Sequence, residues 1–72
     1  MQEASSDSVI RTLVQRLQQV RLSRNLSQQE VYDATGIHIG RLEAKPVNVT
    51  MRTLIILCRY YDVQLAPLFA GL

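Results

Sequence analysis

Two helix starts fall within residues 26–43, and these eighteen positions leave almost no room for a loop between them. Ser27 and Thr35 carry hydroxyl side chains of the kind that favours the position just before a helix. Glu30, three residues after Ser27, completes a capping box, in which the cap and the first helical turn satisfy each other's backbone amides. Two short helices joined by so tight a turn must cross at a steep angle, and this crossing constrains how the rest of the chain can pack.

Apolar residues recur at helical spacing on both sides of this segment, and the pattern predicts five helices. Their expected ranges are Ser8 to Ser23, Gln28 to Ala34, a third that starts after Thr35 and ends near Ala44, Met51 to Tyr61, and Leu65 to Ala70. Pro46 limits the third helix, because a residue before proline avoids helical angles, and Thr50 is expected to cap the fourth. Since no two segments read as paired strands, we predict an all-α, compact five-helix domain over 9–72, after a flexible polar tail over 1–8.

Size and composition exclude several classes of protein. A chain of 72 residues is one small domain that buries only about 60% of its unfolded surface, so self-association would stabilise it. Eight basic residues against six acidic ones give a net charge of +2, which suits a polyanionic partner. A single cysteine and a single histidine supply neither a disulfide framework nor a zinc cluster within one chain, so no metal or cofactor is expected. We predict no enzymatic activity, because paired acids and bases for proton transfer are missing.

The start of the chain indicates the compartment. The first eight residues are polar and acidic, without the positive charge and apolar core of a signal peptide. No apolar run approaches the ~20 residues that cross a bilayer. We therefore expect a soluble, cytoplasmic protein with no membrane partner.

Four segments together carry a resemblance to a known family. They are residues 17–21 (LQQVR), 26–31 (LSQQEV), 39–43 (IGRLE) and the stretch 54–69. Over roughly residues 9–69 the chain resembles the phage repressor and Cro type of helix-turn-helix, the Xre-like DNA-binding family. The resemblance implies a transcription regulator that binds double-stranded operator DNA as a homodimer, with a recognition helix over about 35–44.

One pair of charges follows from this resemblance. In the family, an arginine late in the first helix pairs with a glutamate at the end of the recognition helix, and Arg21 and Glu43 fall at those positions. Arg21 lies next to Val20, near the predicted buried stripe, where a guanidinium needs a carboxylate to offset its desolvation. Such a structural ion pair would pin the recognition helix to the first helix. The alternative is that both are ordinary solvated charges.

The chain also departs from the family, because its turn between the positions of Val31 and Ile39 is shorter by about three residues. The alignment places the residues that face DNA bases or the groove at Thr35, Gly36, Ile37, His38, Gly40 and Arg41. Arg41 can bind a guanine bidentately, His38 can donate to a base or a phosphate, and Ile37 can contact a thymine methyl group. Two alternatives stay open: Ile37 replaces a core residue lost from the turn, and His38 has no role.

Phosphate contacts need only donors in the right places. The candidates are Gln28, Lys45, Asn48, Thr50 and Arg52. For each of them the alternative is a side chain that is simply solvated. The remaining arginines, Arg11, Arg16, Arg24 and Arg59, are predicted to be surface charges.

Apolar residues at the carboxyl end point to a dimer interface. The last eight residues provide more apolar surface than one short helix needs for its own core, through Leu65, Leu68, Phe69 and Leu72. We predict that this patch meets its own copy about a two-fold axis. The alternatives are that the patch packs on a further domain, or that the whole chain is a protein-interaction or oligomerisation module with weak or no DNA binding.

Overall fold

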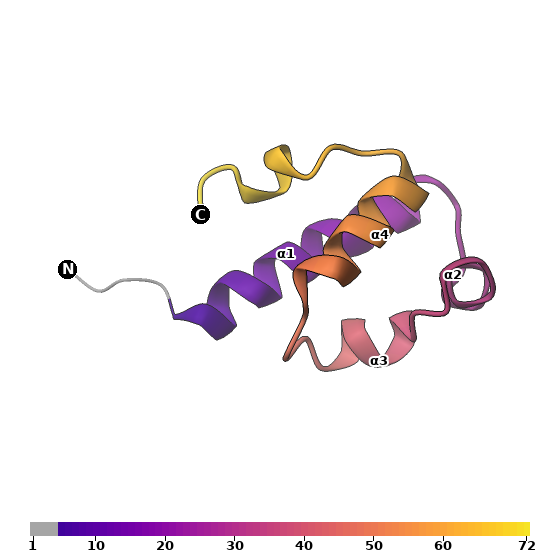
Figure 1. The fold of residues 1–72 in the computed structure, drawn as a ribbon, viewed down its shortest axis with the longest axis horizontal. Coiled ribbons are helices and arrows are strands. Elements are labelled where there is room, and N and C mark those ends of the chain that lie inside the picture. The colour runs from indigo at the N-terminus through magenta and orange to yellow at the C-terminus, as the bar shows by residue number, and fades with distance from the viewer. Residues whose placement is uncertain (1–4) are drawn as a thin grey trace.

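The computed structural model describes residues 5–72, which form four α-helices and one 3₁₀ turn, with no strand in this range (Figure 1). The elements are α1 (Ser6–Ser23), α2 (Gln28–Thr35), α3 (Ile39–Ala44), α4 (Met51–Tyr61) and the 3₁₀ turn η1 (Ala66–Phe69). The all-α prediction is confirmed. The predicted count of five helices is wrong, because residues 66–69 form only one 3₁₀ turn, with Pro67 near its start and Gly71 at a φ of 77° after it.

Side-chain caps place the helix starts. The hydroxyl of Ser5 accepts from the Ser8 amide, so α1 begins at Ser6, two residues before the predicted start; of the predicted tail, residues 1–4 lie outside the described range. The capping box of α2 is present, with 3.0 Å from the Glu30 amide to Ser27 Oγ and 3.1 Å from the Ser27 amide to Glu30 Oε1. Thr50 caps α4 as predicted.

The predicted start of the third helix is wrong. Thr35 does not open α3 but closes α2: its hydroxyl donates to the Val31 carbonyl at 2.7 Å and accepts from the Ile37 amide at 3.1 Å. Gly36 follows with a φ of 77°, a left-handed conformation that glycine adopts without steric cost and that ends a helix. The chain then runs without helical structure to His38, so α3 is only six residues long.

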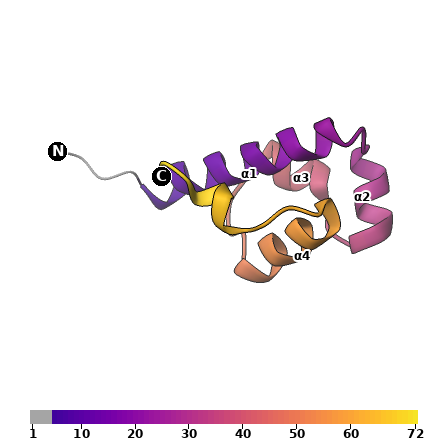
Figure 2. The ribbon, with the colours of Figure 1, turned by 90° about the horizontal axis from the view of Figure 1, so that it is seen from above.

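The long helix α1 is the support on which α3, α4 and η1 pack, while α2 packs on α3 and α4. Figure 2 shows α1 along the top of the view, α3 partly behind it, α4 below, α2 at the right and η1 returning beside α1. The central core consists of Leu13, Leu17, Val31, Ile39, Leu54, Leu57, Cys58, Tyr61 and Leu68. Burial raises the pKa of the Cys58 thiol, which keeps it in the unreactive protonated form. No helix within residues 5–72 combines the length and the apolar character needed to cross a membrane.

Candidate nucleic-acid interface

A bidentate ion pair fixes the carboxyl end of α3. Arg21 Nε lies 2.9 Å from Glu43 Oε2, and Arg21 Nη2 lies 3.0 Å from Glu43 Oε1. The third guanidinium nitrogen, Nη1, donates to the Leu26 carbonyl at 2.7 Å. The two side chains are only 7% and 6% exposed, so the pair lies inside the fold. Hydrogen bonding to Glu43 raises the pKa of Arg21 above its ordinary value despite the opposing effect of burial.

Glu43 also receives two glutamine side chains. Gln18 Nε2 donates to Glu43 Oε1 at 3.3 Å, and Gln28 Nε2 donates to the same oxygen at 3.0 Å. Side chains of α1, α2 and α3 therefore converge on one carboxylate. A Cβ atom at Gly40 would lie 3.0 Å from Gln28 Oε1, so glycine at this position leaves the space that the Gln28 side chain occupies beside α3.

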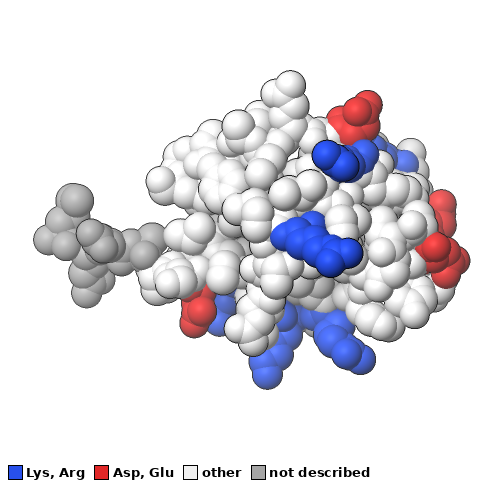
Figure 3. Space-filling model, viewed as in Figure 1, with Lys and Arg blue, Asp and Glu red and all other residues white. Residues whose placement is uncertain are grey.

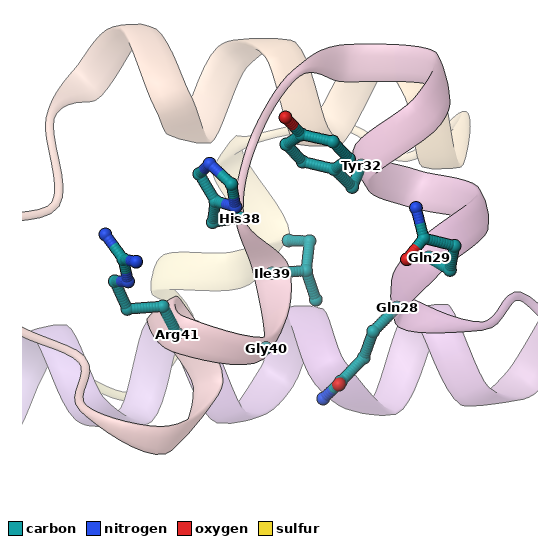
Figure 4. Close-up of a pocket in the computed structure, with 7 residues that line it drawn as sticks. All are labelled: Gln28, Gln29, Tyr32, His38, Ile39, Gly40 and Arg41. Atoms are coloured by element: carbon teal, nitrogen blue, oxygen red, sulfur yellow. The ribbon is translucent and has the colours of Figure 1, made fainter.

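The amino end of α3 is open. A cleft of about 430 Å³ lies between α2 and this end, and its lining consists of Gln28, Gln29, Tyr32, His38, Ile39, Gly40 and Arg41 (Figure 4). The rings of Tyr32 and His38 lie side by side, with centroids 4.4 Å apart and planes inclined by 32°. The Tyr32 side chain, which is 39% exposed, was missed by the sequence analysis because its position on α2 carries no motif.

The structure separates the six predicted base-facing residues into two groups. The Thr35 hydroxyl is bonded within the turn, Gly36 forms the bend, and Ile37 is half-buried against the core, which supports its reading as a replacement core residue. His38 and Arg41, by contrast, are exposed and line the cleft together with Gly40. The open end of α3 therefore presents only His38 and Arg41 as polar side chains from this set.

Most of the predicted phosphate contacts lie in and around the loop after α3. Lys45, Asn48, Thr50 and Arg52 are all exposed, although the Thr50 hydroxyl also caps α4. Asn48 adopts a φ of 55°, and with Lys45, Arg41 and several apolar residues it lines a second hollow of about 330 Å³ between α3 and α4. Gln28, at the start of α2, is exposed, but its side-chain amide is bonded to Glu43.

This surface is positively charged. Between Thr35 and Thr53 the only acid is Glu43, which is buried and paired with Arg21, whereas Arg41, Lys45 and Arg52 are exposed. Figure 3 shows basic side chains protruding along the lower edge of the molecule, where α3 lies in Figure 1. The acids of α2, Glu30 and Asp33, lie outside this segment. The segment from Thr35 to Thr53 therefore offers three exposed cations to a polyanion and no exposed carboxylate of its own.

Two of the arginines that were predicted to be surface charges bond backbone carbonyls of distant segments. Arg16 Nη1 donates to the carbonyls of Leu68 at 2.8 Å and Ala70 at 2.7 Å, which ties the end of the chain to α1. Arg24 Nε donates to the Tyr61 carbonyl at 2.6 Å. The prediction for Arg16 is wrong, since its side chain is half-buried against the end of the chain, whereas Arg24 is exposed as predicted and also bonds a backbone carbonyl. Arg11 and Arg59 are exposed, as predicted.

The carboxyl-terminal apolar set is only partly available to a partner. Leu68 is 6% exposed and belongs to the core, so its assignment to a dimer surface is wrong: η1 folds back and packs it inside the monomer. Leu65 is half-buried. Phe69 and Leu72 remain 37% and 48% exposed. Three residues of α4, Met51, Ile55 and Tyr60, add to the exposed apolar side chains.

Comparison with known proteins identifies the family. Residues 17–68 match the helix-turn-helix family, and the chain belongs to it, in its Xre and Cro branch; the resemblance expected from the sequence is confirmed. The control protein C.SmaI of Serratia marcescens is 36% identical over 59 residues, which are 78% of this chain and 70% of that protein. No solved structure matches the chain. The chain is thus a DNA-binding transcription regulator, and its family is not a class of enzymes.

Proposed function

We propose that this protein binds operator DNA as a homodimer and inserts the amino end of α3 into the major groove. The observation that carries this proposal is the contrast between the two ends of α3. One end is fixed by the buried pair of Arg21 and Glu43, and the other is exposed between cations. A short helix held in this way enters the groove without a cost for ordering itself.

Arg41 is the principal base-reading residue in this proposal. Its side chain makes no hydrogen bond or ion pair within residues 5–72, so its donors are available to the O6 and N7 atoms of a guanine. His38 lies next to it at the start of α3 and supplies a second contact to a base or a phosphate. Thr35 and Gly36 contribute through the turn that positions these two residues, and Gly40 leaves room for the Gln28 side chain beside α3.

Phosphates on either side of the groove are held by two groups of donors. The backbone amides at the start of α2, at Gln28, face one strand, aided by the partial positive charge of the helix start. Lys45, Asn48 and Arg52 hold the other strand, with Thr50 at the start of α4. These contacts fix the register of the protein on DNA and carry no sequence information themselves.

The dimer forms through the exposed apolar side chains at the end of the chain. Phe69 and Leu72, with the half-buried Leu65, meet the same residues of a second copy about a two-fold axis. Such a dimer sets two recognition helices about 34 Å apart, one turn of DNA. Phe69→Ala is expected to shift the protein to monomers in analytical ultracentrifugation, while Leu68→Ala is expected to destabilise the monomer itself, because Leu68 is in its core.

Salt dependence of binding tests the proposal. The dimer is titrated with a duplex selected from random DNA, at several salt concentrations, and the logarithm of the affinity is plotted against that of the salt. Removing one phosphate contact with Lys45→Ala or Arg52→Ala is expected to reduce the slope by about one, whereas Arg59→Ala, on α4, leaves it unchanged. The proposal fails if the protein selects no duplex from random DNA and instead binds a partner protein through Phe69. The chain would then be an interaction module.

A further inference from the structure

We infer that the stacked rings of Tyr32 and His38 form an apolar seat for the methyl group of a thymine, next to the guanine that Arg41 reads. This inference rests on the proposed function. It adds to the DNA interface a residue of α2, Tyr32, and a defined target in the base sequence, a thymine adjacent to a guanine.

The geometry shows that the pair is preformed. The ring centroids of Tyr32 and His38 are 4.4 Å apart with an interplanar angle of 32°, so each ring limits the motion of the other. Neither ring is part of the core: Tyr32 is 39% exposed, His38 is exposed, and neither belongs to the buried cluster. His38 also makes no side-chain cap on α3. Two aromatic side chains are thus held together at the surface without a structural hydrogen bond.

The cleft places this pair beside the base reader. Tyr32, His38 and Arg41 line the same hollow of about 430 Å³, and Figure 4 shows the two rings together at one end of it, with Arg41 extending from α3 near His38. Gly40 lies on the wall between α2 and α3, where the Gln28 side chain fills the space beside it, so the open part of the cleft is the part lined by the rings and Arg41. A base pair bound by Arg41 therefore has its neighbour within reach of the rings.

The faces of the two rings favour a methyl group. The other polar side chains of the cleft apart from Arg41 are Gln28 and Gln29, and their amide groups are bonded to Glu43 and Asp33. Ring carbons do not hydrogen-bond base edges either, but they make apolar contacts. In the major groove, the C5 methyl of thymine is the apolar group that distinguishes one base pair from the others.

Deoxyuridine provides the test, because it differs from thymidine only by that methyl group. Sequences are selected by the unaltered protein from two random duplex libraries, one with thymidine and one with deoxyuridine in its place. We expect a thymine next to the conserved guanine in the first library and loss of that preference in the second. With the selected duplex, deoxyuridine at this position is expected to weaken binding about fourfold, the effect of one buried methyl group.

Variants of Tyr32 assign the methyl contact to the ring. Tyr32→Phe keeps the ring and is expected to retain the fourfold sensitivity to deoxyuridine, whereas Tyr32→Ala is expected to bind both duplexes equally. Circular dichroism at rising temperature checks that each variant is folded. Should Tyr32→Phe lose the sensitivity, or Tyr32→Ala keep it, the aromatic ring is not the seat and the inference fails.

The outcomes also separate this inference from the proposed function. If neither library yields an enriched sequence at moderate salt, the proposed sequence-specific binding itself fails. If a motif is enriched equally from both libraries, the protein is a sequence-specific binder that does not read a thymine methyl, and only the inference about Tyr32 and His38 is overturned. The deoxyuridine comparison needs no variant, so equal binding of the two duplexes would overturn the inference even if Tyr32→Ala does not fold.

Discussion

The basic residues at α1 and those around α3 have the same chemistry but opposite roles. Arg16, Arg21 and Arg24 donate to groups of the protein: backbone carbonyls at the end of the chain, the Glu43 carboxylate and the Tyr61 carbonyl. Arg41 and Lys45 are exposed and form no ion pair in the described part of the chain. The first group stabilises the fold, and the second is left available to a polyanion.

This difference explains how so small a charge excess serves a DNA-binding protein. The net charge is only +2, but the acids are not distributed evenly. Glu43, the single acid between Thr35 and Thr53, is neutralised internally by Arg21. The surface around α3 is therefore more positive than the net charge suggests. Local distribution, rather than the total, decides the affinity of this face for phosphate.

The largest expected effect on stability comes from removing Glu43, the buried carboxylate that Arg21 binds. Glu43→Ala leaves the Arg21 guanidinium buried without its carboxylate and removes the acceptor of Gln18 and Gln28. We expect a loss of about 3 kcal/mol or more in the free energy of unfolding, measured by chemical denaturation. Asp33→Ala, which removes an exposed carboxylate on α2, is the control and should change stability by less than about 0.5 kcal/mol. A loss of that small size for Glu43→Ala would mean that the pair does not hold α3.

The exposed group should show the reverse pattern. Arg41→Ala is expected to leave the unfolding free energy nearly unchanged, because the side chain has no ion-pair partner in residues 5–72, and to weaken binding to the selected duplex by about 1–3 kcal/mol. Fluorescence anisotropy measures the affinity, and Arg59→Ala controls for the loss of one charge. An Arg41→Ala protein that binds like the unaltered one would place the reading surface elsewhere.

A smaller effect on stability is expected at Arg16. Arg16→Ala removes two charged hydrogen bonds to the carbonyls of Leu68 and Ala70, and we expect a loss of about 1.5 kcal/mol. Hydrogen exchange should quicken at residues 66–70 but not in α2, since only the chain end is tied down by this side chain. Arg11→Ala, on the same helix and exposed, is the matched control. If the two substitutions change stability equally, Arg16 does not hold the end of the chain and is an ordinary surface charge.

These contrasts also show what the sequence could predict. Local rules were sufficient for the caps at Ser27 and Thr50 and for the range of α4, because capping and helical spacing depend on neighbours in the chain. They failed at Thr35, where two roles for a hydroxyl compete: it can open a new helix or close the previous one. The left-handed turn at Gly36 decided for closure, and this shortened α3.

The remaining errors concern contacts between distant segments. Arg16 donates to carbonyls more than fifty positions away in the sequence, and the residues around Arg16 do not indicate these bonds. Leu68 was read as surface because the last helix was treated as an isolated amphipathic piece, whereas η1 returns to α1 and buries it. Tyr32 was overlooked for a related reason, since its partner His38 comes near only through the bend at Gly36. Such contacts follow from tertiary packing rather than from pattern.

The smallest effect at neutral pH is expected at Tyr61, beside the internal arginine group. Its hydroxyl is the buried side-chain polar atom without a hydrogen-bond partner in the described residues, so Tyr61→Phe should change stability by less than about 1 kcal/mol and in the stabilising direction. Burial, with the nearby Glu43 charge, raises the pKa of Tyr61 to about 12. An unfolded tyrosine ionises near pH 10, so the folded state holds its proton while the unfolded state loses it.

The sign of the pH dependence follows from this difference. The stability associated with Tyr61 is complete below about pH 10 and is lost as the pH rises toward about 12, at up to about 1.4 kcal/mol per pH unit. Denaturation curves of the two proteins should therefore nearly coincide at pH 7 and diverge above pH 10, with Tyr61→Phe the more stable. Parallel curves through that range would mean that the hydroxyl is hydrated or hydrogen-bonded in solution, so that its ionisation does not distinguish the folded from the unfolded state.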